Sequence, residues 1–433
     1  MRHILNIAIA CICGINGVYT VFAQPIEECS GEQICIEGNQ ESHSWEGSKC
    51  TKCYCAKSDE IEDVTVLSKQ MLEPNGIKLS GDIVIPETIN VRGKKKTVIG
   101  IAQNLFAGNQ NITSVHLPDT IVDIKDFAFD SCSNLQCINL PDGLEVIGEA
   151  AFQLCTSLKE VTIPDSVVRI DDFAFNHCPA IQGTSFKIPA SIKRLGYKAD
   201  APTHTFYDFG TDMMSEFLLD SKNKYYKTEN GILYSKDGSL LISIPNGKTF
   251  ENNTYIMPDS VKELGELSFG RNKNIKTLVI SDNLNVDDKL TSNQCRCFQN
   301  RGNKLNIGIY GYCSVERYET KLSNKKYKSQ DGILYDIDMN SIIAIPCQYN
   351  GVINIPEGVT TWNKDALWVE YVDYFGDISL NKISQINIPS SMSYINKSQL
   401  NGLNHMHDVY QTKFVVEKTN KFYKVENGYL KKI

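Results

Sequence analysis

Hydrophobic residues return at a fixed interval through the first half of the chain. An isoleucine stands five residues before a phenylalanine in four successive blocks spaced 23 residues apart, at Ile101, Ile124, Ile147 and Ile170. The first three blocks go on to a short aliphatic-x-aliphatic-Pro step. A unit this short cannot bury its apolar face alone, so neighbouring units must stack on it. The pattern predicts an α/β, β-rich repeat solenoid, a curved array of units of about 23 residues.

Two further positions of the repeat are interpreted as core-packing positions. The phenylalanines should form a structural ladder of Phe106, Phe129, Phe152 and Phe175. Three residues later the chain places Asn109, Cys132, Cys155 and Cys178. Cysteines at the repeat period could be metal ligands or a disulfide relay. Because asparagine takes the same position at Asn109 and in a distant copy at Asn272, a small buried residue that satisfies a turn is favoured.

The aliphatic-x-aliphatic-Pro step predicts a short strand with one exposed side. The proline lacks an N–H donor and ends strand pairing, and the residue between the aliphatics points away from the core. The exposed side chains expected on this candidate ligand-binding face are Ser114, His116, Asn139, Glu160, Thr162, Thr277 and Val279. They are mostly small and polar, which suits a broad contact with a protein.

A second motif occurs three times in the C-terminal half. It begins with Asn-Lys at Asn223, Asn324 and Asn420 and reaches Asn-Gly or Asp-Gly seven residues later. These dipeptides favour two-residue hairpin turns, so residues 225–245 should form a β-meander. Its basic and aromatic residues could serve as a platform for nucleic acid or glycan, but their place between repeats favours β-hairpin or meander spacers.

These signals divide the chain into segments. A β-hairpin cap with a solvated turn at 93–96 is expected over 64–98, and regular repeats over 99–198. An insertion follows at 199–222. Residues 223–323 and 324–419 each read as a spacer followed by degenerate repeats, the former with a cysteine-containing insertion, and 420–433 as a C-terminal cap.

The N-terminus has the pattern of a secretory signal peptide. Basic residues precede an apolar run, and small residues precede a cleavage point after Ala23, so residues 1–23 should be removed. A lipidation motif at Cys11 is the alternative, although the residues before it fit poorly. After Gln24 no apolar run is long enough to span a membrane. The mature chain is expected to be secreted or at the cell surface, without membrane insertion.

Cysteines also favour an extracellular location. Residues 24–60 carry five of them, which indicates a disulfide-stapled module; zinc, with His43 as an added ligand, is the alternative. A further bridge is expected in the second half. The candidates for disulfides are Cys29, Cys35, Cys50, Cys53, Cys55, Cys295, Cys297 and Cys313.

Composition excludes several classes of function. The net charge of −7 gives no attractive field for nucleic acid. No nucleophile elbow, phosphate loop or dinucleotide fingerprint is present. His405 and His407 read as an incidental loop pair, and the aspartates that follow prolines read as turn residues. A non-enzymatic protein without metal or cofactor is expected.

Units that end in Leu-Pro or Ile-Pro and carry a central Ala-Phe and Cys resemble the BspA-like leucine-rich repeat family, over about residues 64–433. The resemblance implies adhesion to a host or matrix protein. Two alternatives remain. One is a glycan-binding envelope protein that uses aromatic loops at 206–209 or 362–374. The other is a structural, self-associating surface component.

Overall fold

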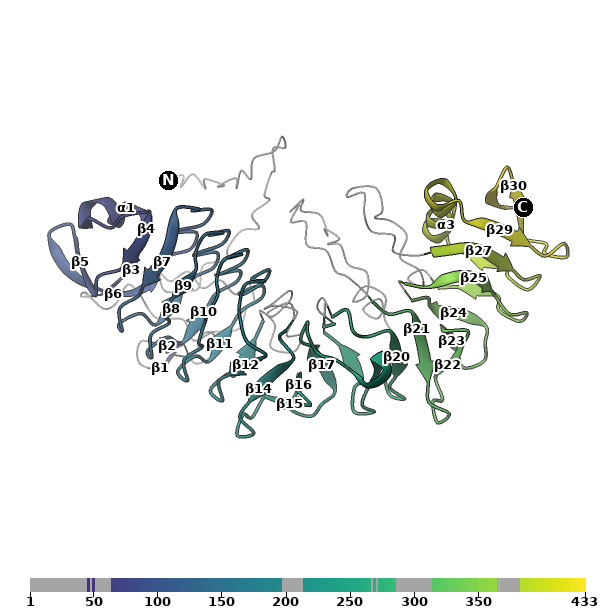
Figure 1. Ribbon diagram of the computed structural model, residues 1–433, viewed down its shortest axis with the longest axis horizontal. Coiled ribbons are helices and arrows are strands. Elements are labelled where there is room, and N and C mark those ends of the chain that lie inside the picture. The colour runs from purple at the N-terminus through teal and green to yellow at the C-terminus, as the bar shows by residue number, and fades with distance from the viewer. Residues whose placement is uncertain are drawn as a thin grey trace, which may run out of the picture.

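The computed structural model describes residues 64–196, 213–265, 268–269, 272–285, 314–346, 348–363, 366 and 382–433, and a short backbone pair of β1 (Trp45–Glu46) with β2 (Lys49–Cys50). Within these ranges the chain is rich in strands that pair mostly in parallel. The elements follow one another along an arc that runs from β5 and β6 at one end to β29 and β30 at the other (Figure 1).

One row of parallel strands carries the repeated isoleucines. It consists of β3 (Val64–Leu67), β6 (Lys94–Ile101), β8 (Asp123–Ile124), β10 (Val146–Ile147), β11 (Arg169–Ile170) and β13 (Arg194–Leu195). Ile101 pairs with Ile124, and Ile147 pairs with Ile170. The 23-residue period is therefore one step between neighbouring strands, which places identical side chains directly above one another.

The aliphatic-x-aliphatic-Pro steps form the second row, called here the strand–Pro row. Its three main sheets join β4 (Gly81–Val84), β7 (Ile112–His116) and β9 (Cys137–Ile138); β18 (Thr254–Ile256), β20 (Thr277–Ile280) and β21 (Arg317–Thr320); and β25 (Asn350–Asn354), β27 (Lys382–Ile388) and β29 (Lys413–Val416). A pair of β12 (Ser185–Ile188) with β14 (Glu216–Leu219) lies between the first two. All these pairings are parallel.

A hairpin stands at the N-terminal end of the rows. β5 (Thr88–Val91) pairs antiparallel with β6, and the turn uses positive φ at Arg92 and Gly93. α1 (Lys69–Leu72) and the 3-10 turn η1 (Glu73–Asn75) precede it. The prediction of a solvated turn at 93–96 was wrong in its position, because Lys94–Lys96 are the first residues of β6 and pair with β5.

The phenylalanine ladder is the centre of the regular block. Phe106, Phe129, Phe152 and Phe175 are buried, and neighbouring rings stack with centroids 5.1–5.3 Å apart. In the second, third and fourth units, the cysteine three residues after the phenylalanine donates its thiol to the carbonyl of the phenylalanine one unit earlier. These bonds run from Cys132 to Phe106 (3.1 Å), Cys155 to Phe129 (3.2 Å) and Cys178 to Phe152 (3.1 Å).

Three antiparallel elements interrupt the parallel rows. The first meander is β15 (Tyr226–Glu229), β16 (Ile232–Ser235) and β17 (Leu240–Ser243); the second is β22 (Tyr327–Gln330), β23 (Ile333–Asp336) and β24 (Ser341–Ala344); the last is the hairpin of β30 (Tyr423–Glu426) and β31 (Tyr429–Lys432). Short parallel strands then follow each meander. β19 (Glu263–Leu264) pairs with β17 of the first meander. β26 (Thr361–Trp362) pairs with β24 of the second, and β28 (Tyr394–Ile395) pairs with β26.

Each meander lies between two hydrophobic cores and is called a wall here. Leu233 and Ile242 belong to the core of the regular block, whereas Ile232, Tyr234 and Leu241 belong to the next core. The second meander divides in the same way. Tyr226 and Tyr234 of the first meander are buried in these two cores and have a packing role, whereas Tyr225 is exposed.

The asparagine that opens each motif fastens the wall to the preceding repeat. Asn223 is buried, donates to the carbonyls of Ala190 and Ile192, and accepts from the N–H groups of Tyr225 and Tyr226. Asn420 makes the equivalent four bonds. An amide is the one side chain that can both donate twice and accept twice here.

The segment with two histidines is a helix. α3 (Lys397–Tyr410) begins at Asn396, whose side chain accepts from Gln399 N–H, and ends at a left-handed Gln411. The prediction of an incidental loop pair at His405 and His407 was therefore wrong about the loop. Two residues apart on a helix, the two imidazoles point in different directions, and His407 Nδ1 lies 2.9 Å from the Thr412 carbonyl.

Candidate functional site

The outer side of the strand–Pro row presents side chains in aligned columns. In its first sheet Asp82 aligns with Ser114, Ser114 with Cys137, and Cys137 with Glu160. Asp82 accepts from Ser114 Oγ at 2.7 Å and from Thr113 Oγ1 at 3.1 Å. These hydrogen bonds lower the pKa of Asp82, so this end of the column is anionic at neutral pH.

The columns continue in the sheets of the second half. Thr254 aligns with Thr277 and Arg317, and Ile256 aligns with Val279 and Glu319. In the last sheet Val352 aligns with Gln385 and Lys413, and Asn354 with Asn387 and Val415. Rows of side chains at strand spacing make a rigid surface whose composition varies while its geometry repeats.

The predicted surface residues divide into two groups. His116, Glu160 and Thr162 are exposed, whereas Ser114, Asn139, Thr277 and Val279 are half-buried. Asn139 accepts from the N–H of Leu117 at 2.7 Å and donates to its carbonyl at 2.9 Å. Its amide is therefore occupied by the neighbouring repeat and offers a ligand less than its position in the sequence indicated.

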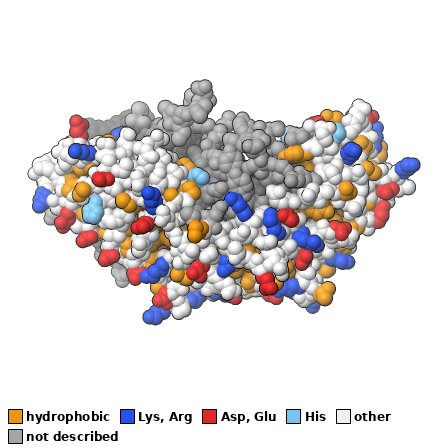
Figure 2. Space-filling model, in the orientation of Figure 1, with side chains coloured by type: hydrophobic (Ala, Val, Ile, Leu, Met, Phe, Trp, Pro, Cys, Tyr) orange, Lys and Arg blue, Asp and Glu red, His pale blue; other side chains and the backbone are white. Residues whose placement is uncertain are grey.

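Sequence reasoning missed the aliphatic side chains on this face. Five exposed ones occupy strands of the row, one or more in each part of it: Val84, Leu218, Ile256, Val352 and Val415. Each alternates with buried neighbours along its strand, and that alternation was the available signal. Figure 2 shows hydrophobic, acidic and basic side chains interspersed over the described surface of one side of the molecule.

The other row of strands carries buried charges. Arg169 Nη2 lies 2.6 Å from Asp171 Oδ2, and its Nε donates to the same carboxylate at 2.7 Å. Arg194 Nη2 lies 3.6 Å from Asp171 Oδ1, and Lys125 pairs with Asp123. Both partners of the Arg169–Asp171 pair are almost fully buried, so each charge offsets part of the cost of burying the other.

Carboxylates also occupy one place of successive repeats, at Asp126, Glu149 and Asp172. Burial raises the pKa of Glu149 to about 7, and the neighbouring aspartates add to the shift. Burial likewise raises the pKa of Asp130 to about 6. Raised values mark functional acids or structural clusters. Within the described residues no group of three or more His, Cys, Asp or Glu side chains is arranged to hold a metal ion.

Buried cysteines of the regular block are disfavoured as thiolates. Burial raises the pKa of Cys132 to about 12 and that of Cys155 well above its usual value. Cys137, in contrast, is exposed on the strand–Pro row. The side chains of the eight cysteines predicted to form disulfides lie outside the described residues.

One of the two aromatic loops suggested for glycan binding is partly placed. Trp362 lies in β26 and is 1% exposed, within the last core. A sugar cannot stack on a ring in that position, so the prediction for Trp362 was wrong. Residues 206–209 and 367–374 lie outside the described residues.

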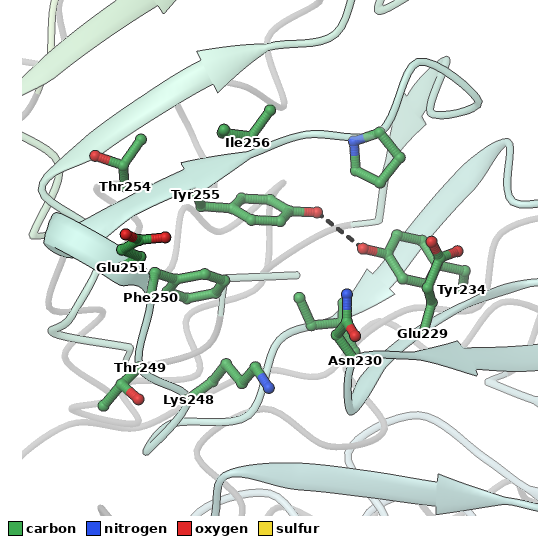
Figure 3. A pocket seen from close by; sticks show the side chains of 12 residues that line it. Glu229, Asn230, Tyr234, Lys248, Thr249, Phe250, Glu251, Thr254, Tyr255 and Ile256 are labelled. Carbon is green, nitrogen blue, oxygen red and sulfur yellow. Dashed lines mark hydrogen bonds between the residues drawn. The ribbon is translucent and has the colours of Figure 1, made fainter.

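A pocket of about 380 Å³ opens beside β18. It lies between the β15–β16 turn, at Glu229 and Asn230, and the segment of Phe250 to Tyr255 (Figure 3). The Tyr234 and Tyr255 hydroxyls lie 3.0 Å apart, and the rings of Phe250 and Tyr255 are 5.1 Å apart. No sequence motif pointed to this pocket, because it forms where a meander meets the next sheet.

The regular block has the sequence pattern of a known repeat family. The sequence model of the BspA type leucine rich repeat region matches residues 87–202 with six copies. This region is a BspA-type leucine-rich repeat array. The strand-rich, parallel-paired architecture is accordingly of the leucine-rich repeat type. The resemblance seen in the Ala-Phe, Cys and Ile-Pro steps is confirmed.

Solved leucine-rich repeat structures resemble the chain at low identity. The pneumococcal vaccine antigen PcpA is 17% identical, with 87% of this chain and 96% of that chain covered and a TM-score of 0.43. A leucine rich cell surface protein from Faecalibacterium prausnitzii is 16% identical, with 88% and 96% covered and a TM-score of 0.38. The comparison with curated proteins found no match. The assignment therefore rests on the repeats at 87–202.

Among the described residues, no helix is both long and apolar enough to cross a bilayer.

Proposed function

We propose that this leucine-rich repeat protein is a secreted or cell-surface binding protein without enzymatic activity, which engages an extracellular host or matrix protein. The observation that carries the proposal is the strand–Pro row, whose outward columns stay in register within each sheet and combine polar with exposed aliphatic side chains. Backbone pairing holds these side chains in place before contact, so little conformational entropy is lost on binding.

The proposal includes the division of the chain. Residues 1–23 are a signal peptide cleaved after Ala23, and 24–60 are a disulfide-linked module. The repeats, the two meanders and the end elements form one curved solenoid, with caps at 64–98 and 420–433. Regular repeats at 99–198, an insertion at 199–222, and units at 223–323 and 324–419 complete it.

Affinity capture tests the binding proposal. The chain from Gln24 to Ile433 is immobilised and exposed to extracts of extracellular matrix and host cell surfaces, and retained proteins are identified by mass spectrometry. We expect one or a few proteins to be retained and then to bind the purified chain with a Kd in about the micromolar range.

Paired charge reversals locate the contact. Glu160→Arg changes an exposed residue of the strand–Pro row, and Asp142→Arg makes the same change at an exposed turn residue after a proline. Glu160→Arg is expected to weaken binding about ten-fold or more, whereas Asp142→Arg leaves it unchanged. Equal effects of the two variants, or capture of nothing above background, would contradict the proposal.

A further inference from the structure

The strand–Pro row is broken wherever a hairpin turn meets it. Phe217 N–H of β14 donates to the Gly231 carbonyl at 2.8 Å, and Tyr318 N–H of β21 donates to the Gly332 carbonyl at 2.9 Å. Both glycines have positive φ, and a Cβ on Gly231 would lie 2.5 Å from Glu216 Cβ. Each turn therefore closes the edge of the sheet before it. The next sheet must begin with a new edge strand, which is β18 after the first turn and β25 after the second.

Among the described residues, no strand pairs with the outer edge of β18. Met257 N–H donates to the Val279 carbonyl and Asn253 O accepts from Lys276 N–H, so the odd-numbered residues face β20. The carbonyl of Thr254 and both backbone groups of Ile256 consequently point the other way. No described residue hydrogen-bonds these three groups, and the Ile256 side chain is 61% exposed. Unpaired groups on an edge strand are a template for another strand.

The equivalent edge of β25 differs. Its outward carbonyl at Val352 accepts a hydrogen bond from the Tyr349 hydroxyl at 3.4 Å. Tyr349 itself is buried at this junction. One junction of the chain thus covers part of its own edge with a side chain, whereas at the other no described side chain does so.

The free edge adjoins the pocket shown in Figure 3. Ile232, Phe250, Tyr255 and Pro258 give the lining an apolar part, and the hydroxyls of Tyr234 and Tyr255 hydrogen-bond to each other. Glu229, Lys248 and Glu251 supply charges of both signs. The volume of about 380 Å³ suits one or two large side chains rather than an extended polar ligand.

We propose that the β18 edge binds an extended segment of a partner protein as an added strand, with a bulky apolar side chain in the pocket. Successive side chains of a strand alternate, so if one enters the pocket the next lies beside Ile256. Backbone groups of Thr254 and Ile256 provide the affinity common to all such segments, and the pocket selects the sequence. The inference rests on the proposed function only in taking a polypeptide as the ligand.

A library of displayed random decapeptides provides the probe. It is selected on the full chain, and enriched peptides are synthesised and measured by fluorescence anisotropy. Ile256→Pro removes the free edge N–H without breaking a bond to β20, and Val352→Pro, which removes an outward N–H from the edge of β25, serves as the control. Circular dichroism establishes that both variants are folded. A second variant, Ile256→Thr, keeps the edge N–H and replaces exposed apolar surface by a smaller side chain with a hydroxyl.

We expect enriched peptides with apolar residues at alternate positions. Their affinity should fall about ten-fold or more in Ile256→Pro and be unchanged in Val352→Pro, with Ile256→Thr between them. Peptides that bind Ile256→Pro as well as the native chain would overturn the proposal, as would a selection without an alternating pattern. If the native chain is a dimer in analytical ultracentrifugation and Ile256→Pro is a monomer, the segment bound at the edge belongs to a second copy of this chain and not to a partner peptide.

The two proposals fail separately. If Ile256→Pro retains the protein captured from extracts while Glu160→Arg loses it, the edge site is refuted and the binding face stands. If peptides bind the edge and no extract protein is captured, the edge site stands without the proposed function.

Discussion

The regular repeats and the meander-bounded second half build the same strand–Pro row in different ways. In the regular block identical residues stack directly, as in the rings of Phe129 and Phe152 at 5.3 Å, and one core runs through the layers. In the second half each meander separates two cores and is tied down by a buried asparagine. Direct stacking propagates a uniform face, whereas a wall interrupts it and leaves an edge and a pocket. The unique features of the molecule therefore lie at the interruptions.

The largest effect is expected from the middle of the phenylalanine ladder. Phe152→Ala should destabilise the chain by about 3–5 kcal/mol, because the ring is fully buried and stacks on both sides. Urea denaturation followed by circular dichroism measures the change. Phe250→Ala, at the half-buried pocket wall, is the comparison and should cost less. An equal loss from both would show that the ladder has no special part in stability.

The asparagine of the first wall comes next. Asn223→Ala removes two donors and two acceptor contacts inside the protein and should destabilise by about 2–3 kcal/mol. Asn134→Ala, at an exposed asparagine with a single bond to the Gln110 carbonyl, serves as the control and should cost under about 1 kcal/mol. Limited proteolysis should cut the Asn223 variant near the meander first. If the two variants are equally stable, the wall is not held by this amide.

Glu149 tests whether the row of carboxylates in the regular block lowers the free energy of unfolding at neutral pH. Its folded pKa of about 7 exceeds the ordinary 4.5, so its contribution to stability is complete below pH 4.5 and is lost as the pH rises through 7. Glu149→Gln stays uncharged and should match the native chain at pH 4.5 but exceed it at pH 8 by about 2 kcal/mol. Denaturation midpoints at both values measure this, with exposed Glu160→Gln as control. A difference that does not change with pH would refute the shift.

The smallest effect concerns one turn position of the repeat. Gly108 and Ser131 occupy equivalent places with φ of 72° and 58°. A Cβ on Gly108 would meet nothing within 4 Å, so Gly108→Ala tests backbone strain alone and should cost about 1 kcal/mol. Ser131→Gly relieves the same strain but also removes the hydrogen bond from Ser131 Oγ to Asp130 Oδ2, so it should stabilise by less, under about 0.5 kcal/mol. Thermal melting temperatures of both variants show the sign of each change in stability. Changes of the same sign would contradict the explanation by backbone strain.

Much of the architecture could be predicted because repetition is a local signal. The isoleucine and phenylalanine positions, the small buried residue at Cys132 and the meander after Asn223 all follow from sequence spacing and turn chemistry. The exposed face was predicted in outline, with His116, Glu160 and Thr162 exposed. The half-burial of Asn139 was not, because its partner Leu117 lies in the neighbouring repeat.

The sequence by itself determined the period of the repeats, the row of strands that each proline ends, and the place of the meanders, since these depend on residues close together in the chain. Tertiary structure alone decided which edges are closed. Tyr349 covers a carbonyl of β25, no described residue bonds to the outward groups of the β18 edge, and Trp362 lies buried in a core. These outcomes depend on how a wall meets the next sheet, and contacts between distant segments leave no periodic trace in the sequence.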